Sequence, residues 1–334
     1  MRVGITSDVF GGAGDQQLTG LVDEVFGGLG LQAVRLSAER DDWTHALDGL
    51  DGLIFEHSAP PVEDVVRSGS VRVIGRLAAG YDDVPVAAFT SAGIAYLNAP
   101  TAYSDAVAQA ALTLMLAVAG RLPERQRLMR QGEDGWDRGA ALIGTGLFGK
   151  TLGILGPGAI GQAVFRLTAP FGMRRIATGA RVLPELAAEL GFIYVDIDAL
   201  CRDADVLVLA CPLNNRTRCI IDARRLGLMK PDAILVNVAR GAVVDEAALV
   251  QALDAGAIAG AGLDTFSTEP SAPDNPLLHS DRVVPSPHGL AITADGYRRA
   301  LIEVAQGVKT LLEGGHPDNL VAQSSRPDPK GARQ

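Results

Sequence analysis

The sequence predicts an α/β protein with two doubly wound parallel-sheet domains and a cleft between them. Short apolar runs typical of buried strands alternate with helical patterns along the whole chain, which indicates parallel sheets. The 334 residues, 47% of them hydrophobic, suffice for two separate cores. A glycine-rich turn between a strand and a helix lies in mid-chain and places one of the two sheets in the second half.

The first domain is expected at residues 1–99, with a return of the chain at residues 290–321. Its sheet should contain five strands, at Val3–Thr6, Ala33–Leu36, Gly52–Phe55, Val71–Gly75 and Ile94–Leu97. A last helix, Thr293 to Glu313, would cross back to this sheet and make the domain discontinuous. The polar tail at residues 322–334 contains proline and is expected to be disordered.

The second domain is expected at residues 100–289. It begins with a helix at Ala102–Ala119, which is apolar on most faces and should be buried between domains or subunits. A loop rich in glycine and charge is expected at Gln131–Lys150. The strands that follow are expected at Thr151–Leu155, Arg175–Thr178, Val206–Leu209, Ile234–Val238, Ala259–Leu263 and Val283–Val284.

The glycine-rich turn has the arrangement that binds the pyrophosphate of a dinucleotide. It reads Gly156-Pro157-Gly158-Ala159-Ile160-Gly161 and precedes a helix expected at Gln162–Phe171. Gly156 would make the tight turn, Gly158 would let the backbone approach the phosphates, and Gly161 would let the helix pack on the sheet. The helix N-terminus would add free N–H groups and a partial positive charge. A tight turn without a ligand is the alternative.

The end of the second strand of this domain favours NADP(H) over NAD(H). An NAD site usually has a carboxylate about 20 residues after the turn, to accept from the ribose 2′-hydroxyl. Here Gly179 stands at the strand end, and no Asp or Glu occurs between Gly161 and Glu185. Arginine pairs with phosphate, so Arg181, near Arg174 and Arg175, would bind the 2′-phosphate. The alternative is a relaxed NAD site with solvated arginines.

Three polar residues follow apolar strands, at the sheet edge where open parallel sheets bind ligands. They are Arg240, Glu269 and His288. Reduction of a 2-keto acid needs a cation for the carboxylate and ketone, which suits Arg240. It also needs a proton donor, which suits His288, and a carboxylate to orient the donor, which suits Glu269. Taken singly, Arg240 could equally form a surface salt bridge, Glu269 could be a loop carboxylate before Pro270, and His288 could be a hydrogen-bonded loop histidine.

Composition argues against several other classes of protein. The net charge is −9 without a long basic run, so nucleic acid is not an expected partner. Cys201, Cys211 and Cys219 do not have the spacing of metal ligands and suit a reducing compartment. The start of the chain is strand-like rather than a signal peptide, and no apolar stretch has membrane-spanning length. A soluble, cytoplasmic protein without a metal is therefore expected.

From about Val71 to Val321 the chain resembles the D-isomer-specific 2-hydroxyacid dehydrogenases, which include glyoxylate/hydroxypyruvate reductases and phosphoglycerate dehydrogenases. Five segments in order carry the resemblance. They are Arg76–Asp82, similar to the loop for the substrate carboxylate; Leu147–Gly153, which leads into the glycine turn; Asn237–Gly241, the arginine signature; Asp264–Pro270, the glutamate signature; and Ser286–Gly289, the histidine signature.

The resemblance implies roles for the matching residues, on a Rossmann cofactor domain and a flavodoxin-like substrate domain. Arg240, Glu269 and His288 would be catalytic, and the backbone N–H groups of Ala79 and Gly80 would hold the substrate carboxylate together with Arg240. The contacts to the cofactor would come from Gly156, Gly158, Ala159, Ile160, Gly161, Gly179, Arg181, Cys211, Pro212, Val238, Asp264 and His288, with Asp264 accepting from the nicotinamide carboxamide. A homodimer with the Ala102–Ala119 helix in its interface is also implied.

Some departures from the family pattern bear on the substrate, and one bears only on a contact of the long helix. Ala78 replaces a glycine of the substrate loop, and Gln109-Ala110 replaces a common Glu-His pair in the long helix. Glu56 lies where phosphoglycerate enzymes tend to have an arginine. Because a carboxylate would repel a substrate phosphate, phosphoglycerate is a disfavoured substrate. The alternative is that Glu56 is only an exposed charge at a strand end.

The function expected from these features is NAD(P)-dependent reduction of a small 2-keto acid, such as glyoxylate or hydroxypyruvate, or the reverse oxidation. Formate oxidation is disfavoured, because enzymes for that reaction have glutamine where this chain has Glu269. The alternative from another class is an NAD(H)-sensing binding protein of corepressor type without physiological turnover.

Overall fold

The computed structural model describes residues 1–10, 16–37, 43–57 and 59–323. The chain divides into two units, Met1–Tyr103 with Thr293–Gln334 and Ser104–Ile292. The sequence predicts the divisions after residues 99 and 289. The first division falls later because helix α5 begins only at Ser104.

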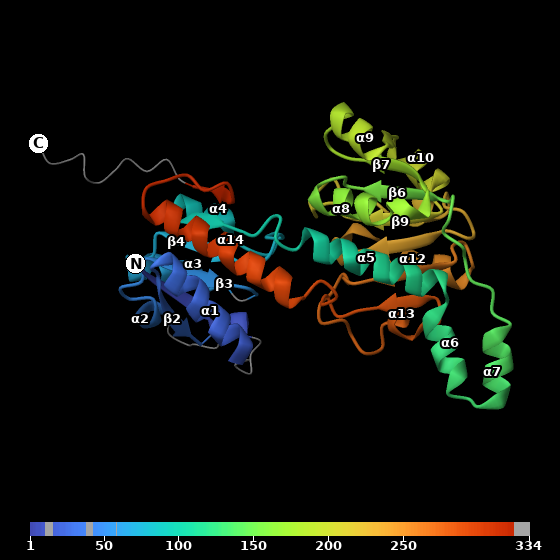
Figure 1. Cartoon of the computed structure of the whole chain (residues 1–334), viewed down its shortest axis with the longest axis horizontal. Helices are drawn as coiled ribbons and strands as arrows, with labels where there is room; N and C mark the ends of the chain where they lie inside the picture. Colours follow the sequence, from blue (N-terminus) through green and yellow to red (C-terminus); the bar gives the residue numbers. More distant parts are fainter. Residues whose placement is uncertain (11–15, 38–42, 58, 324–334) are drawn as a thin grey trace, which may run out of the picture. The chain divides into compact units, whose positions relative to one another are not determined.

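The first unit is built on a six-stranded sheet with the order β13-β5-β4-β3-β1-β2 (Figure 1). Strands β1 to β5 pair in parallel, and β13 is antiparallel to β5. The strand order reverses between β1 and β3, which makes this sheet doubly wound. The strands are β1 Arg2–Thr6, β2 Gln32–Leu36, β3 Gly52–Phe55, β4 Val73–Arg76, β5 Ala95–Leu97 and β13 Leu320–Ala322.

Strand β13 corrects the prediction for the tail of the chain. The sequence predicts disorder from residue 322 onward, yet Ala322 pairs with Tyr96 of β5. The three-residue strand is only partly buried, so its sequence lacks the apolar run that marks the other strands. Residues 324–334 lie outside the described part of the chain, so disorder there stays a prediction.

Helices cover both faces of the first sheet. Helices α1 (Gln16–Leu29) and α14 (Ala294–Leu312) share one apolar core with the inward side chains of the strands. Helices α2 (Trp43–Ala46), α3 (Val62–Ser68) and α4 (Val86–Ser91) pack on the other face. A short 3₁₀ helix, η1, follows β1 at Ser7–Phe10.

The second unit has a seven-stranded parallel sheet with the order β12-β11-β10-β9-β6-β7-β8. The order reverses between β6 and β9, as in dinucleotide-binding α/β domains. Its strands are β6 Thr151–Leu155, β7 Arg174–Thr178, β8 Phe192–Tyr194, β9 Val206–Leu209, β10 Ile234–Asn237, β11 Gly260–Leu263 and β12 Val283–Pro285. The two doubly wound sheets confirm the predicted fold class, whereas the predicted cleft between the units stays a prediction.

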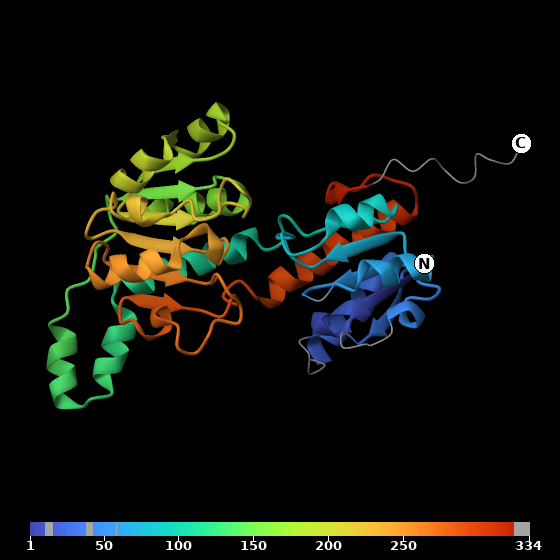
Figure 2. The ribbon, with the colours of Figure 1, turned by 180° about the vertical axis from the view of Figure 1, so that it is seen from behind.

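Helices also cover both faces of this second sheet (Figure 2). One face carries α5 (Ser104–Ala119), α8 (Ala159–Leu167) and α9 (Pro184–Leu190), with η2 (Ala169–Phe171) after α8. The other face carries α10 (Ile197–Asp203), α11 (Ala223–Leu226), α12 (Glu246–Asp254) and α13 (Pro276–His279).

Helix α5 packs directly on the sheet of its own unit. A Cβ on Gly262 of β11 would lie 2.7 Å from Cβ of Leu114, so the helix approaches the strand closely. Its other side is less covered, because Leu116 is exposed. The expected burial between domains or subunits therefore stays a prediction for that side.

One helix, α7, replaces part of the loop that the sequence predicts at Gln131–Lys150, and the rest of that segment has no helix or strand ahead of β6. Helices α6 (Leu122–Met129) and α7 (Glu133–Ala140) form a hairpin that extends away from the sheet of the second unit (Figures 1 and 2). The glycines suggest a loop, but Gly135 serves packing, since a Cβ there would lie 2.0 Å from the Leu128 carbonyl oxygen.

Within the described residues, no single helix has both the length and the apolar composition needed to cross a membrane. Helices α5 and α6 satisfy these two criteria only when taken together, and a bend of 57° separates them.

Candidate dinucleotide and catalytic site

The turn after β6 requires two of its glycines for packing. Gly156 has φ +95, and a Cβ there would lie 2.8 Å from the Ala210 carbonyl oxygen and from the backbone of Cys211. A Cβ on Gly161 would lie 2.5 Å from the Gly156 carbonyl oxygen. Both positions therefore need glycine to bring the turn, the end of β9 and helix α8 together.

Gly158 has a different role, because a Cβ there would meet no atom within 4 Å. It is the N-cap of α8 and has no side chain to satisfy the first N–H groups of the helix. The N–H groups of Ala159 and Ile160 thus lie at the open helix terminus without intrahelical acceptors. Open space beside free N–H groups fits the pyrophosphate of a dinucleotide.

At the end of β7, Gly179 lies close to the glycine turn. A Cβ on Gly179 would lie 2.9 Å from Cδ of Pro157 in the glycine turn, so a side chain there would crowd the turn. The chain that follows carries Arg181, whose side chain is exposed.

Two of the three arginines near this end have structural partners. Arg174 pairs with Asp203 at 3.3 Å, and Nη1 of Arg175 donates to the Leu190 carbonyl at 2.6 Å. Within the described residues, Arg181 makes no hydrogen bond or ion pair. Of the three, Arg181 is thus the one available to a ligand.

Cys211, Pro212 and Val238 lie at the carboxyl ends of β9 and β10, on the same sheet edge as the glycine turn. Cys211 and Val238 are buried, and Pro212 is exposed. Burial raises the pKa of the Cys211 thiol to about 11, so this group is a neutral apolar wall rather than a nucleophile.

Arg240 is placed by the buried side chain of Asn237 at the end of β10. Asn237 accepts from the Ala239 N–H at 3.0 Å and donates to the Arg240 carbonyl at 3.0 Å. One guanidinium nitrogen of Arg240 donates to the Ala239 carbonyl at 2.9 Å. The short 3₁₀ helix η3 (Gly241–Val243) then turns the chain away.

Gly241 joins the arginine loop to the glutamate loop. A Cβ on Gly241 would lie 1.8 Å from the carbonyl carbon of Phe266 and 2.2 Å from the Ser267 nitrogen. The two loops are therefore in backbone contact. Ser267 is held further, because its N–H donates to a carboxylate oxygen of Glu246.

Glu269 and His288 form the central contact of the site. Nδ1 of His288 lies 2.8 Å from Oε2 of Glu269, while Oε1 of Glu269 accepts from the Phe266 N–H at 2.9 Å. A carboxylate can only accept, so the proton lies on Nδ1 and Nε2 is the nitrogen that can serve a ligand. The side chain of His288 is 43% exposed and that of Glu269 is 38% exposed, so the pair is accessible to solvent.

The charge state of Glu269 follows from its surroundings. Partial burial raises the pKa of its carboxyl group, but other contacts outweigh burial and hold the pKa below its usual value. These contacts are the hydrogen bonds from His288 and Phe266 and the nearby charges of His288 and Arg240. Glu269 is thus an anion that holds the imidazole, and Arg240 is close enough to act on it.

In the first unit, Ala79 and Gly80 lie after β4 in the loop similar to a substrate-carboxylate loop. The Ala79 carbonyl accepts from the Asn98 side chain at 2.7 Å. In the described part of the chain, the N–H groups of Ala79 and Gly80 donate to no protein acceptor. At the loop's root, Arg76 is buried, pairs with Asp83, and donates from Nε to the Glu56 carbonyl at 2.9 Å.

Glu56 follows β3 and is not the exposed strand-end charge considered as an alternative, since it is partly buried. Burial and the nearby charge of Asp8 raise the pKa of its carboxyl group to about 7, and Arg76 only partly offsets them. Glu56 is therefore a carboxyl group that changes charge near neutral pH.

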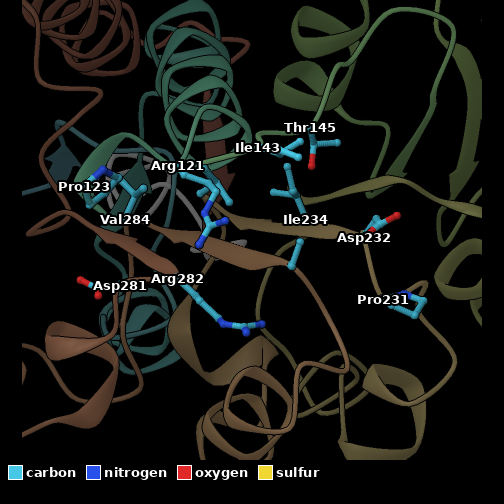
Figure 3. A pocket seen from close by; sticks show the side chains of 12 residues that line it. Arg121, Pro123, Ile143, Thr145, Pro231, Asp232, Ile234, Asp281, Arg282 and Val284 are labelled. Atoms are coloured by element: carbon cyan, nitrogen blue, oxygen red, sulfur yellow. The ribbon is translucent and has the colours of Figure 1, made fainter. Parts of the chain in front are cut away.

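A cavity of about 250 Å³ lies at the other edge of the second sheet. Figure 3 shows the side chains around it, among them Arg121, Asp232, Ile234 and Arg282. Ile234 begins β10 and Arg282 precedes β12, so this cavity faces the amino ends of the strands. It contains none of the predicted site residues. Among the described residues, no group of His, Cys, Asp or Glu is arranged to hold a metal ion.

The sequence analysis assigns no individual role to three residues that shape the site. Asn237 is visible as a polar residue within an apolar strand, which is a signal for a buried hydrogen-bonding role. Gly241 and Glu246 give no such signal, because their contacts join loops that lie far apart along the chain.

The parallel sheet, its reversal beside a glycine turn, and the polar strand ends define a dinucleotide-binding α/β protein. The sequence profile of "D-isomer specific 2-hydroxyacid dehydrogenase, NAD binding domain" matches residues 112–289. The chain belongs to the D-isomer-specific 2-hydroxyacid dehydrogenase family, as its resemblance predicted.

Relatives within the family carry two different names. The chain is 38% identical to a D-3-phosphoglycerate dehydrogenase of Methanocaldococcus jannaschii, over 87% of this chain and 55% of that protein. It is 40% identical to a glyoxylate reductase of Thermococcus onnurineus, over 75% of this chain and 76% of that protein. The chain thus spans about half the length of the phosphoglycerate dehydrogenases it matches.

A solved structure shows the same fold. The crystal structure of a glyoxylate reductase from Paecilomyes thermophila matches with a TM-score of 0.81 and 29% identity. The match covers 96% of this chain and 98% of that one.

Proposed function

We propose that this chain is an NAD(P)-dependent 2-hydroxyacid dehydrogenase that reduces small 2-keto acids of the glyoxylate or hydroxypyruvate kind. The 2.8 Å contact between His288 and Glu269, near Arg240 and on the sheet edge that carries the glycine turn, is the observation that carries this proposal. Family membership and the relatives named glyoxylate reductase support it.

The residues that would hold the cofactor are those of the turn and the neighbouring strand ends. Gly158 leaves space for the pyrophosphate, and Cys211 and Val238 offer apolar surface beside it. A bound reduced nicotinamide supplies the hydride for the ketone carbon of the substrate.

His288, Glu269 and Arg240 then serve the substrate. Arg240 binds the carboxylate and polarises the ketone oxygen, because its guanidinium matches planar oxygens. His288, protonated on both nitrogens, gives the Nε2 proton to the oxygen that becomes the hydroxyl group. Glu269 accepts from Nδ1 throughout, which orients the ring and stabilises its positive charge. From the resemblance of their loop, the N–H groups of Ala79 and Gly80, which donate to no protein acceptor among the described residues, are proposed as further donors to a substrate carboxylate.

The charge of Glu56 is the basis for the proposed substrate class. The loop after β4 begins beside Glu56, whose carbonyl accepts from Arg76. When Glu56 is ionised, which its raised pKa of about 7 confines to neutral and higher pH, its carboxylate would repel a second anionic group on the substrate, such as a phosphate. Small monocarboxylic 2-keto acids are therefore favoured over the phosphorylated substrate in the name of the phosphoglycerate dehydrogenase relatives.

NADP(H) is proposed as the preferred cofactor on the strength of Arg181 and Gly179. Arg181 is the arginine near the end of β7 without a protein partner among the described residues. Gly179 has no carboxylate to accept from a ribose 2′-hydroxyl, and a Cβ there would crowd Pro157. A guanidinium without that carboxylate suits a 2′-phosphate.

A homodimer is proposed because α5, α6, α7 and the segment after them carry exposed apolar side chains. They are Leu116, Leu122, Met129, Trp136 and Ile143. Side chains of this size on one part of a surface are typical of an interface. Sedimentation should show a dimer that Trp136→Ser weakens, while Val66→Ser, an exposed apolar residue on α3, leaves it intact. The cytoplasmic location stays a prediction.

A spectrophotometric screen tests the main proposal. The purified chain is mixed with NADH or NADPH and a panel of 2-keto acids, and the near-ultraviolet absorbance of the reduced nicotinamide is followed. Turnover with glyoxylate or hydroxypyruvate, faster with NADPH, is the expected result. Dinucleotide binding without turnover on any acid would instead favour a binding protein of corepressor type.

A further inference from the structure

Asp264 makes contacts that differ from the cofactor role implied by resemblance. It follows β11 and is 4% exposed, and its N–H donates to the Asn237 carbonyl at 3.0 Å. Its Oδ1 accepts from the N–H groups of Gly289 at 3.2 Å and Leu290 at 3.3 Å. These are the two residues directly after His288, so one carboxylate oxygen holds the turn that carries the imidazole.

His288 itself has an unusual backbone. Its φ is +52, in the left-handed region that a residue with a Cβ adopts only at an energetic cost. Such a conformation persists where the surroundings hold it in place. The hydrogen bonds to Asp264 hold the two N–H groups directly after this residue, and a backbone hydrogen bond from the Ile292 N–H to the Gly289 carbonyl at 3.0 Å closes the turn further on.

We infer that Asp264 is a positioning residue for His288: it stabilises the left-handed turn and thereby aims Nδ1 at Glu269 and Nε2 at the substrate. This inference deepens the proposed function and rests on it. Without the buried acceptor, the turn can relax to an ordinary negative φ. The imidazole then loses its 2.8 Å contact with Oε2 of Glu269.

The geometry makes a distinction between two substitutions. Both N–H groups donate to the same oxygen, so the amide oxygen of Asp264→Asn can replace it. Asp264→Ala removes the acceptor and leaves two N–H groups without a partner. A role in holding the turn therefore predicts that Asn rescues what Ala loses.

The kinetic test compares these two variants with the unaltered chain. We expect Asp264→Ala to lower kcat about a hundredfold, since a misplacement of about 1 Å costs that much. KM for the keto acid and Kd for the reduced dinucleotide should stay within about threefold, because Arg240 and the glycine turn are unaltered. Asp264→Asn should restore kcat to within about fivefold of the original value.

A matched control is Asp196→Ala. Asp196 also accepts a backbone N–H, from Ala199 at 2.8 Å, but it caps helix α10 away from the proposed catalytic residues. Its loss should cost a helix cap and leave kcat unchanged. Should Asp264→Ala fail to fold, Asp264→Ser serves in its place, because the shorter hydroxyl group cannot reach both N–H groups.

A proton NMR measurement separates this inference from the proposed function. The Nδ1 proton of His288, assigned by its absence in His288→Asn, should give a downfield resonance in the unaltered chain and in Asp264→Asn. It should be lost in Asp264→Ala. This pattern would support the positioning role even if the screen found no turnover. Retention of the resonance and of kcat in Asp264→Ala, or a rise in dinucleotide Kd as its main effect, would overturn the inference.

Discussion

Substitution of Gly158 by alanine tests the dinucleotide site without disturbing the fold. The backbone at Gly158 has φ −78 and ψ −161, which alanine adopts freely, and a Cβ would meet no atom within 4 Å. We therefore expect the free energy of unfolding to change by about 1 kcal/mol or less, as for alanine at an N-cap. The added methyl group would instead occupy the space where the pyrophosphate must approach the backbone.

The size of the effect on binding follows from overpacking. A methyl group forced into a well-fitted contact costs about 1–3 kcal/mol, which corresponds to an affinity about 5- to 150-fold weaker. Isothermal titration calorimetry with NADPH and NADH measures this loss, and thermal unfolding measures stability. Unchanged affinity in Gly158→Ala would refute the assignment of the turn to the pyrophosphate.

Two other glycines complete the comparison. Gly156→Ala should lower the free energy of unfolding by about 2 kcal/mol or more, because φ is +95 and backbone atoms lie 2.8 Å from the new Cβ. Gly146→Ala, where a Cβ also meets no atom within 4 Å, should change neither stability nor affinity. Loss of binding in this control would show that any added methyl group in this unit disturbs the site indirectly.

Three further predictions concern charge. Glu56→Gln should raise the free energy of unfolding at about pH 8 by on the order of 3 kcal/mol, and the difference should vanish near pH 4. The reason is that a carboxyl group with a raised folded-state pKa costs stability as pH rises from its usual pKa of 4.5 to about 7. A pH-independent difference would contradict this prediction. Glu269→Gln should lower the free energy of unfolding above about pH 5 by less than about 1 kcal/mol, because the side chain of Glu269 is partly exposed. The difference should disappear near pH 3, since the stability that a lowered pKa adds is lost in acid. Arg181→Ser should weaken NADPH binding about tenfold and leave NADH binding unchanged. The control is Arg202→Ser, which replaces an exposed arginine on α10 and should change the affinity for neither cofactor. Equal losses of affinity for both cofactors in Arg181→Ser would contradict the role of Arg181.

Much of the second unit can be predicted from the sequence, because its signals are local. Buried parallel strands read as apolar runs, so the predicted bounds of β6, β9 and β10 agree with the structure within one or two residues. Polar residues directly after such runs lie at the carboxyl edge of the sheet. This relation alone predicts that Arg240, Glu269 and His288 lie near each other.

Other features depend on contacts between distant segments and leave no local signal. The sequence predicts a loop at α7 because Gly135 and Gly139 reduce helix propensity, yet Gly135 is needed where α7 approaches Leu128. The left-handed φ of His288 has no marker in the sequence, because glycine or asparagine is the usual residue there. The contact of Gly241 with Phe266 likewise exists only once the two loops have folded together.

The central claim is that His288 donates the proton during reduction of a 2-keto acid. The rate of nicotinamide oxidation in a single turnover of His288→Asn, with cofactor and glyoxylate saturating, tests it most directly. Asparagine tolerates the left-handed backbone at φ +52, so the turn should remain folded. A rate lower by about 10²- to 10⁴-fold than in the unaltered chain is predicted. An unchanged rate would contradict the account.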